Sequence, residues 1–107
     1  NGVAPNVVHS VDSAGMIKTV NIAYKNGIKN FCNVHDSFGT TAGDVEMLNK
    51  SIREAFIDMF SKHDILNDFR EDVLKQLPDK LKSKLPEIPS KGDLDINKLR
   101  ESKFFFA

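Results

Sequence analysis

Apolar residues recur at spacings of three and four along the first quarter of the chain, which is the pattern of one helical face. This spacing predicts a helix from Asn6 to about Lys25, and Pro5 suits its first turn because no backbone N–H donor is needed there. Asn26-Gly27 is a typical helix stop, so residues 1–27 are expected to form one helical segment. The apolar positions are Val7, Val8, Val11, Ala14, Ile17, Val20 and Tyr24, and a second face carries His9, Asp12, Ser13 and Met16.

A short apolar run over residues 28–34 breaks at His35-Asp36-Ser37 and resumes over residues 38–41. Two short strands that meet at a polar turn give this pattern, so residues 28–41 are predicted to form a β-hairpin. Regular alternation points Cys32 and Val34 to one face. The other face would carry Phe31, Asn33 and His35, and the Asn indicates that this face is not a simple core.

Residues 42–77 show the clearest helical periodicity. Thr41 and Asp44 have the spacing of a capping box, which predicts a helix that runs to about Lys62. Asp64 is predicted to cap a further helix that ends at Leu77, before Pro78. The expected inward positions are Val45, Leu48, Ile52, Ala55, Phe56 and Met59 in the first helix, and Ile65, Leu66, Phe69, Val73 and Leu77 in the second.

The last third of the chain is different in character. Prolines and lysines dominate residues 78–92, which predicts an extended basic connector, either a solvated loop or a strap that faces phosphates. Residues 95–101 are expected to form a short helix with Ile96 and Leu99 facing inward. Three aromatic residues then precede Ala107, and left exposed they would form an adhesive patch. We expect this tail to pack, either on the chain's own core or inside a larger structure.

Composition and charge narrow the class of protein. A chain of 107 residues with 40% hydrophobic and 28% charged residues is typical of one small globular domain. Lys+Arg and Asp+Glu are equal at 15 each, so overall charge gives no reason to expect nucleic-acid binding. Cys32 is the only cysteine, and its apolar neighbours predict a buried thiol in a reducing compartment. We expect a soluble intracellular protein without a membrane span, and the start at Asn1 without Met suggests a piece of a longer one.

Asp36 is the first candidate for chemistry. A lone carboxylate at a hairpin tip needs a partner, and a hard divalent cation is a natural one. Asp also favours turns for backbone reasons alone, so a purely structural role is the alternative. Other sites find little support: the histidines and Cys32 lack zinc-ligand spacing, opposite strand faces separate Cys32 from His35, and no glycine-rich phosphate loop is present.

Four motifs then follow one another in an informative order. They are residues 4–10 (APNVVHS), 34–40 (VHDSFGT), 48–56 (LNKSIREAF) and 92–107, which end in FFFA. Together they closely resemble the C-terminal end of single-subunit, phage-type DNA-dependent RNA polymerases, a family that includes mitochondrial enzymes. The chain departs from the phage pattern at Val11 and Gly15, where a polar residue and a second His are common.

The resemblance implies roles for several residues. His35-Asp36-Ser37 looks like the family's palm motif C, so Asp36 would be one of two carboxylates that hold two catalytic Mg²⁺ ions. His35 would support the primer end or the incoming nucleotide. His9-Ser10 resembles the helix motif near the template–product pair, and Phe106-Ala107 resembles the terminus that folds back toward the active centre. The second metal-binding Asp is not recognisable, so the ion site would be completed from outside this chain, unless Asp12 supplies it locally.

The resemblance also implies a fold and partners. The expected fold is α+β, with helices packed around the short hairpin and an extended C-terminal tail, as a fragment of a right-hand polymerase fold. Residues 1–107 would be the C-terminal part of the catalytic domain, with a helix at 1–27, the hairpin at 28–41, helices at 42–77, a connector at 78–92 and a terminal foot at 93–107. The implied partners are DNA template, RNA product, nucleoside triphosphates and the rest of the polymerase, in the host cytoplasm rather than a mitochondrion.

Two alternatives stay open at this point. A family A DNA polymerase uses a similar His-Asp hairpin, although Ser37 stands where those enzymes typically place Glu. A non-enzymatic helical binding or structural module is the other. Because one carboxylate cannot hold two Mg²⁺ ions, and because the nucleotide-handling Lys and Tyr are not recognisable, the isolated chain is expected to be inactive.

Overall fold

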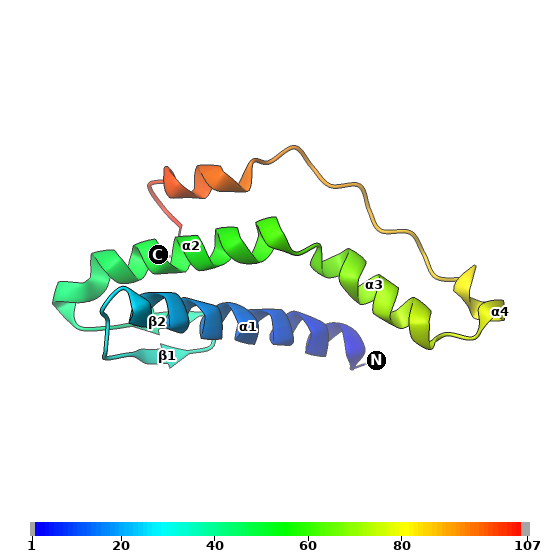
Figure 1. Ribbon diagram of the computed structural model, residues 1–107, viewed down its shortest axis with the longest axis horizontal. Coiled ribbons are helices and arrows are strands. Elements are labelled where there is room, and N and C mark those ends of the chain that lie inside the picture. Colours follow the sequence, from blue (N-terminus) through cyan, green and yellow to red (C-terminus); the bar gives the residue numbers. More distant parts are fainter. Residues whose placement is uncertain (1, 106–107) are drawn as a thin grey trace.

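Two long helices lie side by side and carry the other elements (Figure 1). The computed structural model describes residues 2–105. The class is α+β, as expected, because the helices accompany one two-stranded antiparallel sheet among the described residues. In chain order the elements are α1 (Val3–Lys25), β1 (Cys32–Val34), β2 (Ser37–Gly39), η1 (Ala42–Asp44), α2 (Val45–Lys62), α3 (Ile65–Gln76), α4 (Asp79–Lys82) and η2 (Ile96–Arg100).

The best-packed part of the core lies where α1 and α2 meet the hairpin. Its buried residues are Ala23, Ile28, Leu48 and Ile52, and Phe31, Phe38 and Phe105 pack against them. Farther along the helix pair, Asp58 on α2 forms ion pairs with Lys18 on α1 and with Lys62. Hydrogen bonds from these two lysines lower the pKa of Asp58 to about 2. An apolar cluster and a bridging carboxylate therefore hold α1 against α2.

Helical periodicity located α1 and α2 correctly but overstated how much of each face is buried. Helix α1 begins at Val3, earlier than predicted, and Val8 and Ile17 are exposed instead of packed. Val45, in the first turn of α2, is also exposed, at 53%. The prediction of an inward side chain was wrong at Val45, and on α3 it was also wrong at Leu66, which is 57% exposed. On α1 the apolar residues do not form one face: Val8 and Ile17 are nine positions apart, which puts them on opposite sides of the helix, so one partner helix cannot cover both.

The helix starts differ from each other in how they are capped. Asp64 accepts a hydrogen bond from the Asn67 backbone N–H at 3.4 Å, so the predicted cap of α3 is confirmed. The predicted capping box at Thr41 was wrong. The Thr41 hydroxyl donates to the Asp44 carboxylate at 2.9 Å, and neither side chain bonds a backbone N–H of the helix. Residues 42–44 form a 3₁₀ turn there, which leads directly into α2.

The C-terminal third runs back over α2 after a long excursion (Figure 1). The predicted connector contains the one-turn helix α4 and a turn at residues 83–85, and it is extended over residues 86–92. The predicted short helix is the 3₁₀ helix η2, and its Ile96 and Leu99 are half-buried as expected. Phe104 is 85% exposed, so the expectation that all three tail rings pack was wrong for this one. Phe105 is half-buried, whereas Phe106 and Ala107 lie outside the described residues.

The described part of the chain is elongated. Its radius of gyration is 17.0 Å, against about 13 Å for a compact domain of this length. The extended arm formed by α3 and α4 accounts for the length visible in Figure 1. None of the helices in residues 2–105 is long and apolar enough to cross a membrane.

Candidate active site

The hairpin turn consists of two residues, His35 and Asp36. Val34 pairs with Ser37 and Cys32 pairs with Gly39, so the strands close directly around this pair. His35 has a φ of 53°, in the left-handed region that non-glycine residues seldom adopt but His tolerates better than most. The predicted turn is confirmed, and both side chains are exposed at its tip.

The strands themselves are shorter than predicted. Residues 28–31 were expected to belong to the first strand, but β2 offers only three residues for pairing, so β1 begins at Cys32. The alternation of faces is confirmed between Cys32 and Val34, which are exposed, and Asn33, which is half-buried. The prediction of a buried Cys32 thiol was wrong, because a two-stranded sheet leaves this face uncovered.

The hairpin tip adjoins the polar face of α1. His35 lines a cavity of about 390 Å³ together with His9 and Asp12. Asp36 lines a smaller cavity of about 60 Å³, which it shares with Asp12 and with Phe56 of α2. The structure therefore brings His9, His35 and Asp36 of the predicted site into one neighbourhood, and Asp12 belongs to both cavities.

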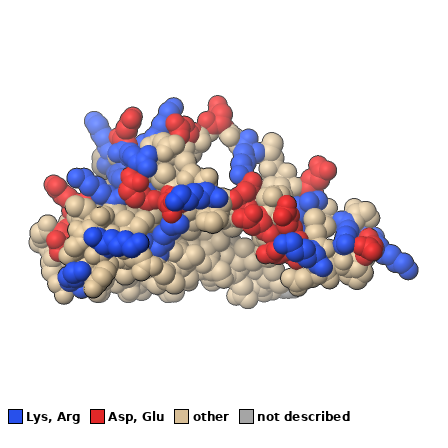
Figure 2. All heavy atoms as spheres, in the orientation of Figure 1, with Lys and Arg blue, Asp and Glu red and all other residues tan. Residues whose placement is uncertain are grey.

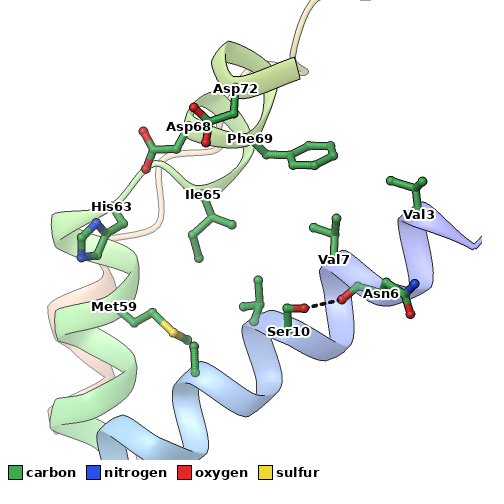
Figure 3. A pocket seen from close by; sticks show the side chains of 12 residues that line it. Val3, Asn6, Val7, Ser10, Met59, His63, Ile65, Asp68, Phe69 and Asp72 are labelled. Carbon is green, nitrogen blue, oxygen red and sulfur yellow. Dashed lines mark hydrogen bonds between the residues drawn. The ribbon is translucent and has the colours of Figure 1, made fainter. Parts of the chain in front are cut away.

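Ser10 lies elsewhere. It lines a groove of about 610 Å³ between α1 and α3, whose walls include Val7, Phe69 and Ile65 (Figure 3). Its hydroxyl donates a hydrogen bond to the carbonyl of Asn6, at 2.7 Å, one helical turn back in α1. Adjacent positions on a helix point about 100° apart, so His9 faces the hairpin while Ser10 faces α3. The structure does not bring Ser10 together with Asp36.

The C-terminal tail approaches the same site through aromatic packing. The Phe105 ring meets the Phe56 ring edge-on, with centroids 5.2 Å apart. Phe56 lines the small cavity of Asp36. Phe106 and Ala107, the tail residues expected at the active centre, follow directly but lie outside the described residues.

The comparison with known proteins decides the family. A family model described as DNA-dependent RNA polymerase matches residues 1–85. The chain belongs to the phage-type DNA-dependent RNA polymerase family. It is 42% identical to T7 RNA polymerase of Escherichia phage T7 over 108 residues, which cover 100% of this chain and 12% of that enzyme. It is 39% identical to DNA-directed RNA polymerase 1, mitochondrial, of Arabidopsis thaliana over 103 residues, 96% of this chain and 10% of the relative.

The resemblance drawn from the four motifs is thereby confirmed at the level of the family. The polymerase from Enterobacteria phage T3 shows 39% identity over 108 residues, again 100% of this chain and 12% of the relative. The chain thus spans about an eighth of the length of these phage polymerases. Relatives occur in phages and in organelles, so the family alone does not assign a compartment.

The polymerase family implies a divalent metal, and the residues at the hairpin fit part of such a site. Mg²⁺ in proteins is commonly bound by one or two carboxylates, with water and substrate phosphates as the other ligands. Asp36 offers an exposed carboxylate, and Asp12 shares its small cavity. Across residues 2–105 no three or more His, Cys, Asp or Glu side chains gather into a metal-binding group. The fit is therefore to an ion that takes most of its ligands from elsewhere.

One feature of this polymerase segment was not predicted as a site feature. Asn33 lines the cavity of His9 and His35, and its buried Oδ1 has no hydrogen-bond partner among the described residues. An unmet buried acceptor is costly, and the only sequence sign was a polar residue in an apolar run.

Figure 2 shows acidic and basic side chains intermixed on the face it displays, without a continuous basic patch. Nucleic-acid contact on this face would depend on individual groups more than on net charge.

Proposed function

We propose that this chain works as the C-terminal part of the catalytic domain in a longer phage-type RNA polymerase. In this proposal the hairpin β1–β2 is palm motif C of a right-hand fold. Asp36 is one of two carboxylates that hold the catalytic Mg²⁺ ions during nucleotide addition to RNA on a DNA template. The family match supports this assignment, and so does the coverage of only 12% of the phage relatives.

The single observation that carries the proposal is the placement of Asp36. Its carboxylate is exposed at a two-residue turn, and short paired strands fix the backbone on both sides. Two-metal nucleotidyl transfer needs carboxylate oxygens on a rigid support, since both ions must stay about 3.5–4 Å apart. When bound, the ions supply charge stabilisation for the attacking and leaving oxygens.

The neighbouring side chains have distinct parts in this proposal. His35 and His9 line one cavity and can donate hydrogen bonds to the primer end, the nucleotide or a base edge in the minor groove. Ser10 bonds its own helix, so its part would be to stabilise α1 more than to contact nucleic acid. Phe106 and Ala107 would complete the site from the tail. The partners would be template DNA, product RNA, nucleoside triphosphates and the rest of the polymerase chain.

The 107-residue chain alone is proposed to be inactive. Asp36 and Asp12 are the carboxylates that line the small cavity, and no larger metal-binding group exists among the described residues. The isolated chain also offers no continuous basic surface on the face shown in Figure 2 to hold template DNA. For a phage-encoded enzyme the site of action would be the host cytoplasm.

The direct test is Asp36→Asn in the full-length polymerase. We expect RNA synthesis to fall by more than about 100-fold, because even groups behind a metal ligand commonly cost 10–100-fold when removed. Binding of promoter DNA, measured by mobility shift, should stay near the wild-type level. Asp93→Asn is the matched control, since Asp93 is an exposed carboxylate in the extended segment before η2. Near-normal synthesis by the Asp36 variant would refute the proposal.

The comparisons favour this function over both alternatives. The matching family and the relatives named above are RNA polymerases, which argues against a family A DNA polymerase. They also argue against a non-enzymatic module, because the chain aligns over its whole length with enzymes.

A further inference from the structure

The C-terminal segment returns to α2 at one short place. Between α4 and η2 the chain is extended and exposed for most of its length. Two side-chain contacts guide it, from Arg70 to the Pro86 carbonyl at 3.1 Å and from Lys91 to Asp64 at 2.8 Å. The contact of η2 with α2, shown in Figure 1, therefore sets where the tail lies.

Adjacent residues of α2 hold adjacent residues of η2. Glu54 accepts two hydrogen bonds from the guanidinium of Arg100, one from Nε at 2.7 Å and one from Nη2 at 2.9 Å. This is the paired geometry that makes Arg–carboxylate contacts directional. Next to it, the Arg53 guanidinium donates to the Leu99 carbonyl through Nη1 and to Asn49 Oδ1 at 2.8 Å through Nε.

These contacts continue into the tail. Arg53 is 9% exposed, and its guanidinium lies 5.4 Å from the centroid of the Phe105 ring. The same ring packs on Phe56, which lines the cavity of Asp36. A side chain that bonds η2 on one side and stacks on Phe105 on the other couples the position of η2 to that of the tail. The hydrogen bond from Arg100 also lowers the pKa of Glu54, so this carboxylate stays ionised at neutral pH.

We infer that Arg53, Glu54 and Arg100 are positioning residues, which act as a latch that fixes the C-terminal tail beside the Asp36 hairpin. The latch rests on the proposed function, because it matters for catalysis only if the tail completes the polymerase active centre. It acts through Phe105 and Phe56 and does not touch substrate.

The test uses the full-length polymerase with Arg100→Leu and Glu54→Gln. We expect each change to lower kcat for nucleotide addition about fivefold, the equivalent of about 1 kcal/mol, which is the upper end for an exposed ion pair. KM for nucleotide should change less than kcat, and amide exchange should rise over residues 96–105. The double variant should lose about as much as Arg100→Leu alone, because that change already removes both hydrogen bonds to Glu54, whereas the amide oxygen of Glu54→Gln can still accept one of them. Lys98→Leu is the matched control, an exposed cation in η2 that makes no side-chain bond to α2 in the described structure.

Three results would overturn the latch. One is an Arg100→Leu enzyme that exchanges faster in the tail but keeps its wild-type kcat. Another is a loss of activity equal to that of Lys98→Leu. The third is a fully additive double variant. The Asp36→Asn enzyme separates this failure from failure of the proposed function: if that variant is inactive while the latch variants are normal, only the latch is wrong.

Discussion

Ile52 on α2 belongs to the core cluster against which Phe38 of the hairpin packs. Its replacement by Ala gives a stability change that can be worked out from the structure. The side chain is 6% exposed and lines two cavities that also include Asp36 and Phe38. Ile52→Ala removes three carbon atoms, which at about 0.8 kcal/mol each is roughly 2.4 kcal/mol of lost burial. A cavity of about 60 Å³ already adjoins the site, so the neighbours are not expected to close the new space fully. With the added cavity cost, we expect a total loss of about 3 kcal/mol.

Urea denaturation of the 107-residue chain, followed by far-ultraviolet circular dichroism, measures this loss through the unfolding midpoint at constant slope. Ile17→Ala is the matched control, because it is the same substitution on α1 at a side chain that is 58% exposed. The control should change the free energy of unfolding by less than about 0.5 kcal/mol, since little burial is lost and Ala favours helix. If Ile52→Ala costs less than about 1 kcal/mol, or no more than the control, then α2 does not support the hairpin as described.

Two further predictions concern charge and backbone geometry. The Lys18 and Lys62 hydrogen bonds lower the pKa of Asp58 from 3.8 to about 2, so this pairing stabilises the fold above about pH 4 and is lost as pH falls toward 2. An acid titration of unfolding should be flatter over that interval for Asp58→Asn, and parallel curves for variant and wild type would contradict the assignment. His35 has φ 53°, so His35→Val should destabilise the hairpin by about 1–2 kcal/mol while His35→Gly should not. Amide exchange over residues 32–39 distinguishes the two variants. Equal exchange in both would show that the positive φ at residue 35 does not strain a β-branched side chain.

The sequence predicted those elements whose cause is local. The turn at His35-Asp36 follows from polar residues that interrupt an apolar run, and the cap at Asp64 follows from a side chain that bonds a backbone N–H three residues on. The extent of α2 follows from periodicity over 18 residues. In each case the residues that decide the structure lie within a few positions of one another, so no knowledge of the tertiary fold was needed.

The wrong predictions have a common physical origin, because each depends on which other element of the fold packs against the residue. The first strand begins only at Cys32, because β2 offers no more than three residues for pairing. Cys32 is exposed since no third element covers that face. Likewise, neither Arg53 nor Arg100 has a sequence pattern that distinguishes it from a surface cation. Arg53 is buried because the tail returns over α2 from 46 residues away, a contact that periodicity and spacing do not encode.

Helix α1 leaves apolar side chains exposed, and it also lies beside the proposed metal site. Val3, Val8 and Ile17 expose 58–65% of their surface along α1, the helix that also supplies His9 and Asp12 to the hairpin cavities. A helix that leaves apolar side chains uncovered on this scale is typical of one that packs on further structure. The same holds for the metal site, where Asp36 provides one carboxylate on a rigid turn and the described residues form no larger metal-binding group. Asp12 of α1 lines the small cavity of Asp36, so a segment of a longer polymerase that packed beside Asp12 would lie close enough to supply a further metal ligand. This position of Asp12 supports the proposal that the active centre is assembled between this chain and the rest of a polymerase.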